Sequence, residues 1–375
     1  MILKEVKARK IKNSNGEEAI EVEIDGCRAS APSGKSRGKH ESKPYYRNIN
    51  FCVKFLNGWR DELEINEFND LEKAEEVIRR NLGLKDAKKF GGNSLFAFES
   101  AILKALAKEK GKELWEIINP KARKIPFPVG NAVGGGKHSS NKNKPVFQEF
   151  LLIPQENSIR KNIKVMKKLY KRIGKLVKGN GRDDEGAWQT SLNYQEILGV
   201  LSKLGVEIGI DVAASSFYRQ GSYFYKNKPI ERREHIRRMN EIASKYDLLY
   251  LEDPLQEEDF RGFSEIKGRL IVGDDLTVTN LNRIKRAVLK KSINAVVVKP
   301  NQNGSLLEVK DVVDFCKKKE IKTIFSHRAG ETMDSALADY AFGFQADYIK
   351  TGIFGKERKA KLKRLARIER RLKNL

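Results

Sequence analysis

The chain is poor in cysteine, tryptophan, histidine and long apolar runs. Three cysteines occur in 375 residues, they lie far apart, and no CxxC spacing is present. This pattern excludes a disulfide framework and a zinc ribbon, so we expect Cys27, Cys52 and Cys316 to be reduced and buried. No apolar stretch approaches the length of a bilayer span, and the first residues, MILKEVKARK, lack a signal-peptide core. We therefore expect no membrane span and a cytoplasmic location.

Acidic residues are also in short supply. Lys and Arg number 74 against 50 Asp and Glu, which gives a net charge of +24. Such an excess attracts polyanions, including nucleic acid. Charge-rich surfaces with few cysteines are also common in proteins from hot environments, so we keep nucleic acid as a partner without favouring it. Residues 356–375 hold ten of the Lys and Arg with apolar residues at helical spacing, which predicts a docked amphipathic helix with a basic outer face.

The first third of the chain reads as a small α+β unit. Residues 1–55 alternate as strands do, as in EAIEVEI, and residues 70–118 have helical periodicity. Between them, residues 31–46 form a long loop of small and charged residues, for which a functional role is expected. Pro120 and the segment KARKIPFP mark a boundary, so the predicted domains are residues 1–120 and 121–375.

The second part alternates short apolar strands with amphipathic helices. The strands are VFQEFLLIP, VEIGID, LLYLED, LIVGDD, NAVVVKP, KTIFSH and ADYIK, and helices fit near 158–178, 190–204, 231–245, 257–267, 280–291, 305–319, 331–342 and 356–373. Repeated strand–helix units predict an α/β fold with a closed parallel sheet, a TIM-type barrel.

Almost every predicted barrel strand ends in a charged or ionisable residue. In a parallel barrel these ends meet on one face, where active sites are built. Three acids on successive strands, with no His or Cys beside them, predict a site for Mg²⁺ or Mn²⁺. The polar residues at the strand ends are Asp211, Glu252 with Asp253, Asp274 with Asp275, Lys299, His327 with Arg328, and Lys350.

A lysine next to such a cation is a candidate base. Nearby positive charge disfavours the ammonium form, which lowers the lysine pKa. Lys299 or Lys350 could then remove a proton from a carbon next to a carboxylate, provided that a metal neutralises the dianion that forms.

These segments, in this order, resemble the enolase family. GGKHSSNK followed by FQEFLLIP is similar to the family's histidine loop and QEF strand, and DDEGAW is similar to its GDEGG segment. IGIDVAASSFY, LEDPLQEEDF, GDDLTVTN, KPNQNGSL, SHRAGETMD and IKTG each resemble a family signature. The resemblance spans most of the chain. It implies an enolase-type (β/α)8 TIM-like barrel behind a smaller N-terminal α+β capping domain with a mobile loop.

The resemblance also implies a lyase, a phosphopyruvate hydratase of glycolysis, that dehydrates 2-phosphoglycerate with two Mg²⁺ per active site. A lysine base with one or two Mg²⁺ is the general arrangement in enolase-superfamily sites. The implied roles are Asp211, Glu252 and Asp274 as ligands of the first Mg²⁺, Lys299 as the base at C2, and Glu185 as the general acid at C3, supported by Glu149.

The remaining implied residues bind the substrate. Lys350, near the carboxylate, and His327 would hold the substrate, Arg328 would bind its phosphate, and His138 would cover it from a mobile loop, with a part in catalysis. Ser36 would reach the second Mg²⁺ and the substrate when its loop closes, which would expel water. A homo-oligomer, a dimer or larger, is implied as well.

Some positions depart from the family pattern. The lid reads SGKSRG instead of SGASTG, which adds Lys35 and Arg37, and the serine of SHRSG, a second phosphate contact, is Ala329. The extra lid cations could compensate for the lost serine. The N-terminal DSRG turn, used for subunit contacts, reads NSNG.

Two other functions stay open. The altered lid and Ala329 are compatible with a paralogue that acts on another anionic hydroxy acid. The net charge is compatible with a non-catalytic RNA-binding homologue, although such a protein has no physical reason to keep the acids and lysines of the site. We expect His235 to lie on an exposed helix face, and Trp59, Trp115 and Trp188 to be packing residues.

Overall fold

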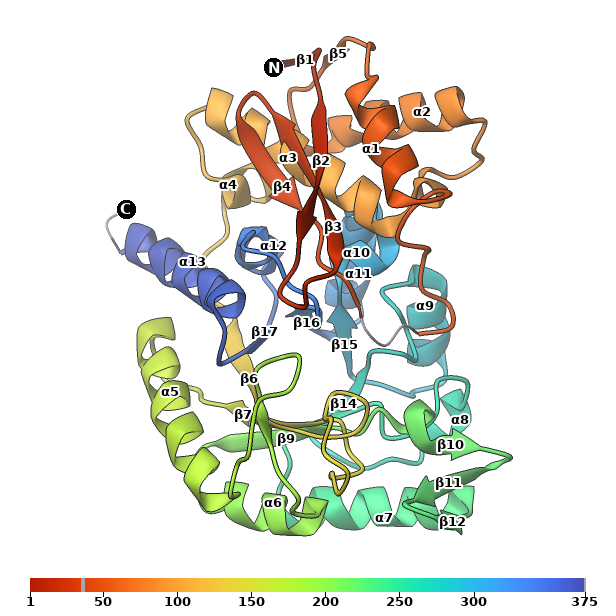
Figure 1. Cartoon of the computed structure of the whole chain (residues 1–375), viewed down its shortest axis with the longest axis vertical. Helices are drawn as coiled ribbons and strands as arrows, with labels where there is room; N and C mark the ends of the chain where they lie inside the picture. The colour runs from red at the N-terminus through yellow and green to blue at the C-terminus, as the bar shows by residue number, and fades with distance from the viewer. Residues whose placement is uncertain (35–37, 374–375) are drawn as a thin grey trace.

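The computed structural model describes residues 1–34 and 38–373, and its N-terminal part is a small α+β layer (Figure 1). The strands β2 (Lys7–Lys12), β3 (Glu18–Ile24) and β4 (Cys27–Ser30) form an antiparallel meander, and β1 (Ile2–Leu3) pairs with β5 (Leu63–Glu64). Helix α3 (Gly92–Glu109) packs across β3 and β4. The other helices of this layer are α1 (Ile49–Asn57), α2 (Leu71–Leu82) and α4 (Leu114–Ile118), with single 3-10 turns at Phe68–Asp70 and Ala87–Phe90.

The second part is a closed eight-stranded barrel, as the sequence predicts. Strands follow one another around the ring and the last pairs with the first, Tyr348 to Phe127. The barrel strands are β6 (Phe127–Gly134), β7 (Glu149–Ile153), β9 (Glu207–Asp211), β13 (Tyr250–Glu252), β14 (Leu270–Gly273), β15 (Ala295–Val298), β16 (Lys322–Ser326) and β17 (Tyr348–Gly352). A short strand, β8 (Trp188–Gln189), adds to β6 outside the ring.

The barrel differs from the prediction in one strand and in one direction. Strand β6, FPVGNAVG, is missing from the predicted set because its proline and glycines interrupt the apolar run. Strand β7 runs antiparallel to both β6 and β9, so the sheet is not fully parallel. Because of this reversal, Glu149 at the start of β7 pairs with Asp211 at the end of β9. Glu149 therefore lies at the same mouth as the strand-end acids.

Most helices around the barrel lie where periodicity predicts them. They are α5 (Ile159–Leu176), α6 (Tyr194–Leu201), α7 (Arg232–Lys245), α9 (Leu281–Leu289), α11 (Leu306–Lys318) and α13 (Lys356–Leu372), with α10 (Pro300–Asn303) as one turn. Helix α8 (Phe260–Phe263) is shorter than predicted, and α12 (Ala336–Gly343) begins later because residues 327–335 form a loop. A small sheet, β10 (Tyr218–Arg219), β11 (Ser222–Tyr225) and β12 (Lys228–Ile230), was not predicted, and a 3-10 turn, Ala214–Phe217, precedes it.

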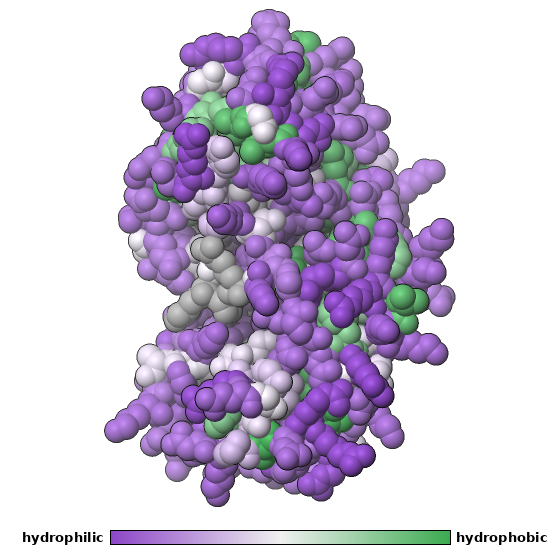
Figure 2. All heavy atoms as spheres, turned by 90° about the vertical axis from the view of Figure 1, so that its right-hand side faces the viewer, coloured by the Kyte–Doolittle hydropathy of each residue, from purple (hydrophilic) through white to green (hydrophobic). Residues whose placement is uncertain are grey.

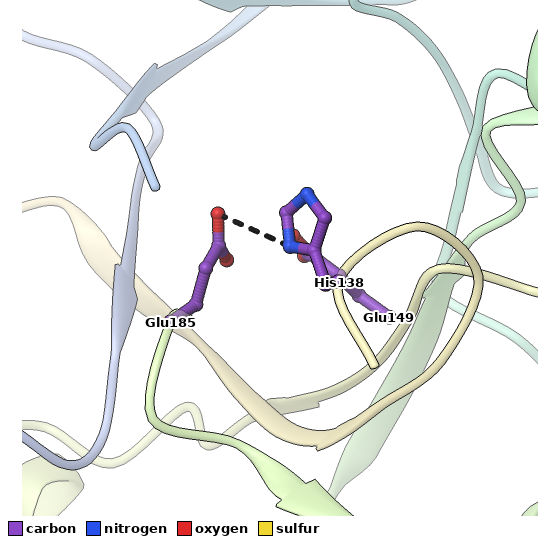
Figure 3. A group of neighbouring side chains, drawn as sticks. All are labelled: His138, Glu149 and Glu185. Atoms are coloured by element: carbon purple, nitrogen blue, oxygen red, sulfur yellow. Dashed lines mark ion pairs between the residues drawn. The ribbon is translucent and has the colours of Figure 1, made fainter. Parts of the chain in front are cut away.

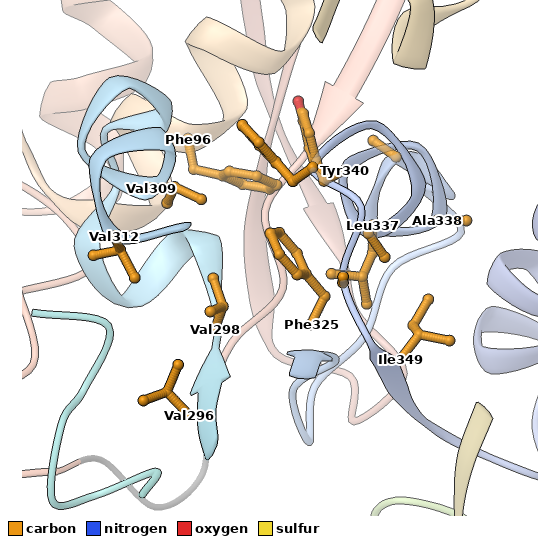
Figure 4. Close-up of a cluster of buried hydrophobic side chains, with 14 of the residues drawn as sticks. Phe96, Val296, Val298, Val309, Val312, Phe325, Leu337, Ala338, Tyr340 and Ile349 are labelled. Carbon is orange, nitrogen blue, oxygen red and sulfur yellow. The ribbon is translucent and has the colours of Figure 1, made fainter. Parts of the chain in front are cut away.

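A shared apolar core joins the two parts (Figure 4). Phe96 of α3 lies edge-on to Tyr340 of α12, with ring centroids 5.9 Å apart. The Tyr340 hydroxyl donates a hydrogen bond of 2.7 Å to Ser100 Oγ of α3. Phe325 of β16 packs into the same cluster. This core fixes the N-terminal layer over the mouth of the barrel.

The surface is mostly hydrophilic. Figure 2 shows one face covered largely by polar and charged residues, with apolar residues scattered among them. Within residues 1–34 and 38–373, no helix combines the length and the apolar character that a bilayer crossing needs. Cys52 and Cys316 are buried, Cys27 is partly buried, and all three are free thiols, as predicted except for the partial exposure of Cys27.

Candidate active site

One pocket at the barrel mouth gathers nearly all of the predicted site residues. It has a volume of about 470 Å³. Ser36, Lys35 and Arg37 lie outside the described residues, and Glu252 lies behind the pocket wall, where it pairs with Lys350. The other nine predicted residues line the pocket: His138, Glu149, Glu185, Asp211, Asp274, Lys299, His327, Arg328 and Lys350.

Lys350, near the end of β17, stands at the centre of a carboxylate cluster. Its Nζ lies 2.7 Å from Glu252 Oε2, 2.9 Å from Glu149 Oε2 and 3.4 Å from Asp211 Oδ2. The Tyr250 hydroxyl also donates to Glu252. Burial disfavours the ammonium, but these carboxylates outweigh it and raise the pKa of Lys350 well above its usual value. Lys350 is therefore a fixed positive charge in this state.

Lys299, directly after β15, pairs with Asp274 after β14. Lys299 Nζ donates a very short hydrogen bond to Asp274 Oδ2, while Asp274 Oδ1 is buried and accepts no hydrogen bond from the described residues. The backbone N–H groups of Asp274 and Asp275 both donate to the Asp253 carboxylate, which fixes the loop. Burial lowers the pKa of Lys299, but Asp274 outweighs burial and the net shift is upward.

A second group, of two glutamates and a histidine, lies beside the Lys350 cluster (Figure 3). Glu185 comes from the loop before β8, Glu149 from β7, and His138 from the loop after β6. His138 Nδ1 lies 3.6 Å from Glu185 Oε1, and His327 Nε2 lies 3.4 Å from Glu185 Oε2. Asn131 Nδ2 donates to the same carboxylate at 3.4 Å.

The pKa values of the two glutamates shift in opposite directions. Burial and the negative charge of Glu185 raise the pKa of Glu149 well above its usual value. Burial acts on Glu185 in the same direction, but His327 and His138 outweigh it and lower the pKa of Glu185. Opposite pKa shifts in two neighbouring carboxyl groups are typical of residues that act as acid and base.

The loop that carries Glu185 is held from two sides. Asp183 Oδ1 accepts hydrogen bonds from the backbone N–H groups of Glu185 and Ala187, at 2.9 and 2.8 Å. From helix α13, Arg358 Nη2 donates to the carbonyl of Asp184 and to that of Ala329, both at 2.8 Å. Arg358 thus links the Glu185 loop to the loop that carries His327 and Arg328.

Arg328 lies where the N-terminal loop meets the barrel. Its Nη2 donates to Glu41 Oε1 at 2.8 Å, and its Nη1 donates to Asn301 Oδ1 at 3.1 Å. A Cβ on Gly34 would lie 1.9 Å from Arg328 Nη2, so the loop passes this close only with glycine there. The side chains of Arg328 and Glu41 are almost fully buried. The Glu41 carboxylate thus pairs with the Arg328 guanidinium, the group that the sequence predicts to bind the phosphate of the substrate.

The predicted metal acids are compatible with a hard cation. Asp211, Glu252 and Asp274 offer oxygens alone, the donors that Mg²⁺ prefers. The Lys350 ammonium lies between two of them, and Asp274 Oδ1 is a buried acceptor with no donor in residues 1–34 and 38–373. Among the described residues, however, the ligand atoms that come within 4.8 Å of one another belong to His138, Glu149 and Glu185, not to these three acids.

Sequence reasoning missed several residues and misplaced others. Asp253 and Asp275 are the second acids of LED and GDD and were visible in the sequence. The sequence did not predict that they order the loop after β14. Glu41 carried no signal beyond its place in the long loop. The prediction that His235 is exposed is wrong. His235 is buried, its ring stacks on that of Tyr223 with centroids 3.8 Å apart, and its Nε2 lies 2.7 Å from Pro254 O.

The basic outer face predicted for the last helix is correct only in part. Leu362, Leu365 and Ile368 dock as expected, but Arg358 and Lys361 also point inward and are buried. Lys361 Nζ pairs with the Glu331 carboxylate and donates to Thr332 O at 2.7 Å. Of the tryptophans, Trp59 and Trp115 are buried and Trp188 is partly buried under Arg182.

Comparison with known proteins covers the barrel and nearly the whole chain. Residues 122–375 match the family model "Enolase, C-terminal TIM barrel domain". The chain is 35% identical over 396 residues to the protein named Enolase of Archaeoglobus fulgidus, an alignment that covers 98% of this chain and 97% of that one. It is 37% identical over 400 residues to the Enolase of Pyrobaculum aerophilum, with 96% and 94% covered, and 34% identical over 395 residues to that of Thermoplasma acidophilum, with 98% of both covered. The chain therefore belongs to the enolase family.

Proposed function

We propose that this protein is a phosphopyruvate hydratase, a lyase of glycolysis and gluconeogenesis that interconverts 2-phosphoglycerate and phosphoenolpyruvate plus water. The observation that carries the proposal is the pocket at the barrel mouth, which is lined by the Lys299–Asp274 pair and by two glutamates whose pKa values shift in opposite directions. These are a base and an acid that could serve one elimination. The family membership of the chain supports the same reaction.

Lys299 is the proposed base at C2 of the substrate. In the free protein Asp274 raises the pKa of Lys299, so the lysine is an ammonium. Asp274 would help to hold a cation, whose nearby positive charge would lower the pKa of Lys299 towards that of a usable base. The neutral amine takes the C2 proton, and the electron pair of the C–H bond moves toward the substrate carboxylate.

Glu185 is the proposed acid at C3. The shared proton of Glu149 and Glu185 goes to the C3 hydroxyl, the C3–O bond breaks, and water leaves while the C2–C3 double bond forms. His138 and His327 keep Glu185 in place through contacts of 3.6 and 3.4 Å. His138 also covers the substrate in this proposal.

The cofactor is proposed to be Mg²⁺, two ions per site, the first held by Asp211, Glu252 and Asp274. Bound there, Mg²⁺ supplies positive charge beside the substrate carboxylate, where negative charge develops. Lys350 adds a fixed positive charge near the same group. Arg328 and His327 bind the rest of the substrate, with the phosphate on Arg328. Ser36 is proposed as a ligand of the second ion and of the substrate.

A second candidate is an enolase-like enzyme for another anionic hydroxy acid. Ala329, adjacent to Arg328, offers no hydroxyl to a second phosphate oxygen, and this observation favours a substrate without that oxygen. The two candidates differ in substrate and share the acid–base chemistry.

Ultraviolet absorbance of phosphoenolpyruvate, measured with 2-phosphoglycerate before and after removal of Mg²⁺ by a chelator, tests the proposal. We expect turnover that disappears with the chelator and returns with added Mg²⁺. Turnover of other hydroxy acids, with none of 2-phosphoglycerate, would select the second candidate instead.

A further inference from the structure

The charged residues of helix α5 are all positive, and they lie outside the proposed active site. Its 18 residues contain no acid and eight cations. All eight are exposed: Arg160, Lys161, Lys164, Lys167, Lys168, Lys171, Arg172 and Lys175. None of them belongs to the described lining of the pocket at the barrel mouth. We call these eight residues the α5 basic face.

The α5 basic face is not part of an ion-pair network. None of its cations forms an ion pair with a residue in 1–34 or 38–373, and lysines stand four apart, as Lys164 and Lys168 do. Like charges at this spacing destabilise a helix. In contrast, Arg237 and Arg238 of α7 pair within their own helix with Glu241 and Glu234. Adaptation to heat favours networks of the α7 kind, so it does not explain α5.

The neighbouring helix extends the positive surface. Helices α5 and α13 pack side by side on one flank of the molecule (Figure 1). At their junction, the buried Glu369 of α13 accepts from Ile159 N at 2.9 Å and Ser158 Oγ at 3.1 Å, so this acid is used as a cap. Three exposed cations of α13 form no ion pair with residues 1–34 or 38–373: Lys363, Arg367 and Arg370.

The face suits phosphates in a row better than a lipid surface. The apolar side of α5, Met166, Leu169 and Ile173, is buried against the barrel, so it cannot insert between lipids. The helix is about 27 Å long, a rigid row of cations that could follow several successive phosphates of one strand. Its cations have long flexible stems and make backbone contacts without reading bases.

We propose that the α5 basic face, with the adjoining part of α13, binds single-stranded nucleic acid through its phosphate backbone, without sequence preference. This activity is additional to catalysis and does not depend on it. The electrostatic repulsion along α5 is relieved in the complex, where phosphates neutralise the lysines.

The test uses fluorescence anisotropy of the full chain with a labelled, unstructured RNA of about 20 nucleotides. The variant Lys164→Gln, Lys168→Gln, Lys171→Gln, Lys175→Gln removes one stripe of the face. The matched control Lys290→Gln, Lys291→Gln, Lys318→Gln, Lys319→Gln removes four exposed lysines at the ends of α9 and α11, away from α5. Both variants have the same net charge.

We expect the α5 variant to bind RNA at least about tenfold more weakly at 50 mM NaCl, and we expect its salt slope, d log K/d log[NaCl], to be less negative by about 3. The control variant should stay within about twofold of wild type. Equal hydratase activity in all three proteins shows that they are folded. The proposal would be overturned if the wild-type protein did not bind the RNA, or if both variants lost RNA affinity equally. Binding to phosphatidylserine vesicles in place of RNA would also overturn it.

Discussion

At the scale of single residues, the site is built from charges that hold one another in place. Lys350 satisfies three carboxylates from three strands, and Lys299 satisfies the fourth, Asp274. Two lysines face four buried acids, and burial together with the charge of Glu185 raises the pKa of Glu149. The proposed cation site at Asp274 and the proposed proton transfer from the glutamate pair both rest on this arrangement.

The sequence pattern predicted Asp211, Glu252, Asp274, Lys299 and Lys350 because strand ends are easy to recognise, whereas Glu149 and Glu185 came from the resemblance to the enolase family. An apolar strand followed by an acid or lysine places that side chain at the mouth. It did not predict partners set by tertiary contact, such as Glu41 with Arg328. The prediction for His235 was wrong for the same reason: the residue lies on the buried face of α7 with Ile236 and Met239, and the β11 strand that covers its ring was not predicted.

His235 makes the fold sensitive to acid. Burial lowers the pKa of His235 to about 4 in the folded protein, against about 6.5 in the unfolded chain. The unfolded chain therefore binds a proton first as the pH falls, and the unfolding free energy decreases between pH 6.5 and 4. The loss for this one group is about 3 kcal/mol.

His235→Gln tests this assignment, because glutamine can keep a polar contact to Pro254 O but does not titrate. Urea unfolding at pH 7 and at pH 4 should show that the variant loses about 3 kcal/mol less than wild type over this interval. The control is Gln195→Glu, on the exposed side of α6. If wild type and His235→Gln lose the same free energy, the acid sensitivity lies elsewhere.

At the scale of elements, helix α13 holds in place the two loops that carry Glu185 and Arg328. Arg358 reaches the carbonyls beside Glu185 and Arg328, and Lys361 pairs with Glu331, whose carboxylate accepts from the backbone N–H of Arg328 at 3.0 Å. A side chain on Gly352 would lie 2.5 Å from Arg358 Cδ, so this glycine leaves space for the arginine. Such basic residues on an apolar helix stripe could not be recognised as buried from their type alone.

Arg358→Met should lower kcat about 10- to 100-fold and change KM less, because the acid and the phosphate ligand lose their fixed separation. Arg358→Lys should recover part of the loss, since an ammonium can still donate to both carbonyls. Steady-state kinetics with 2-phosphoglycerate measure both, with Lys363→Met, an exposed residue of the same helix, as the control. A wild-type kcat in Arg358→Met would show that the brace has no part in catalysis.

In the proposed mechanism, Glu41 of the segment 38–41 would compete with the substrate phosphate for Arg328. Glu41 is a carboxylate on the guanidinium that is proposed to bind phosphate. Glu41→Gln keeps the size of the side chain but removes its charge, so the phosphate displaces a weaker partner. We expect the KM for 2-phosphoglycerate to fall about threefold to tenfold, with kcat little changed.

Glu258→Gln serves as the matched control for Glu41→Gln. Glu258 pairs with His40, which belongs to the segment 38–41, at 2.5 Å, but Glu258 does not line the pocket. The KM of Glu258→Gln should therefore equal that of wild type. A KM that rises in Glu41→Gln would mean that Glu41 helps to bind the substrate instead of competing with it.

At the scale of the whole molecule, strand–helix alternation predicted the barrel, and the family match confirms it. It could not predict the direction of β7, since a short apolar strand reads alike in both directions. It missed β6 because glycine and proline hide the pattern. The division at residue 120, the homo-oligomer and the cytoplasmic location stay predictions.

The central claim is that Lys299 removes the C2 proton and that the glutamate pair then protonates the leaving hydroxyl. Proton NMR of 2-phosphoglycerate in D₂O with Mg²⁺ measures exchange at C2 directly, separately from phosphoenolpyruvate formation. We predict that Glu185→Gln still exchanges the C2 proton while dehydration falls at least about a hundredfold, and that Lys299→Ala does neither. Exchange that survives in Lys299→Ala would contradict the account, because another residue would then be the base.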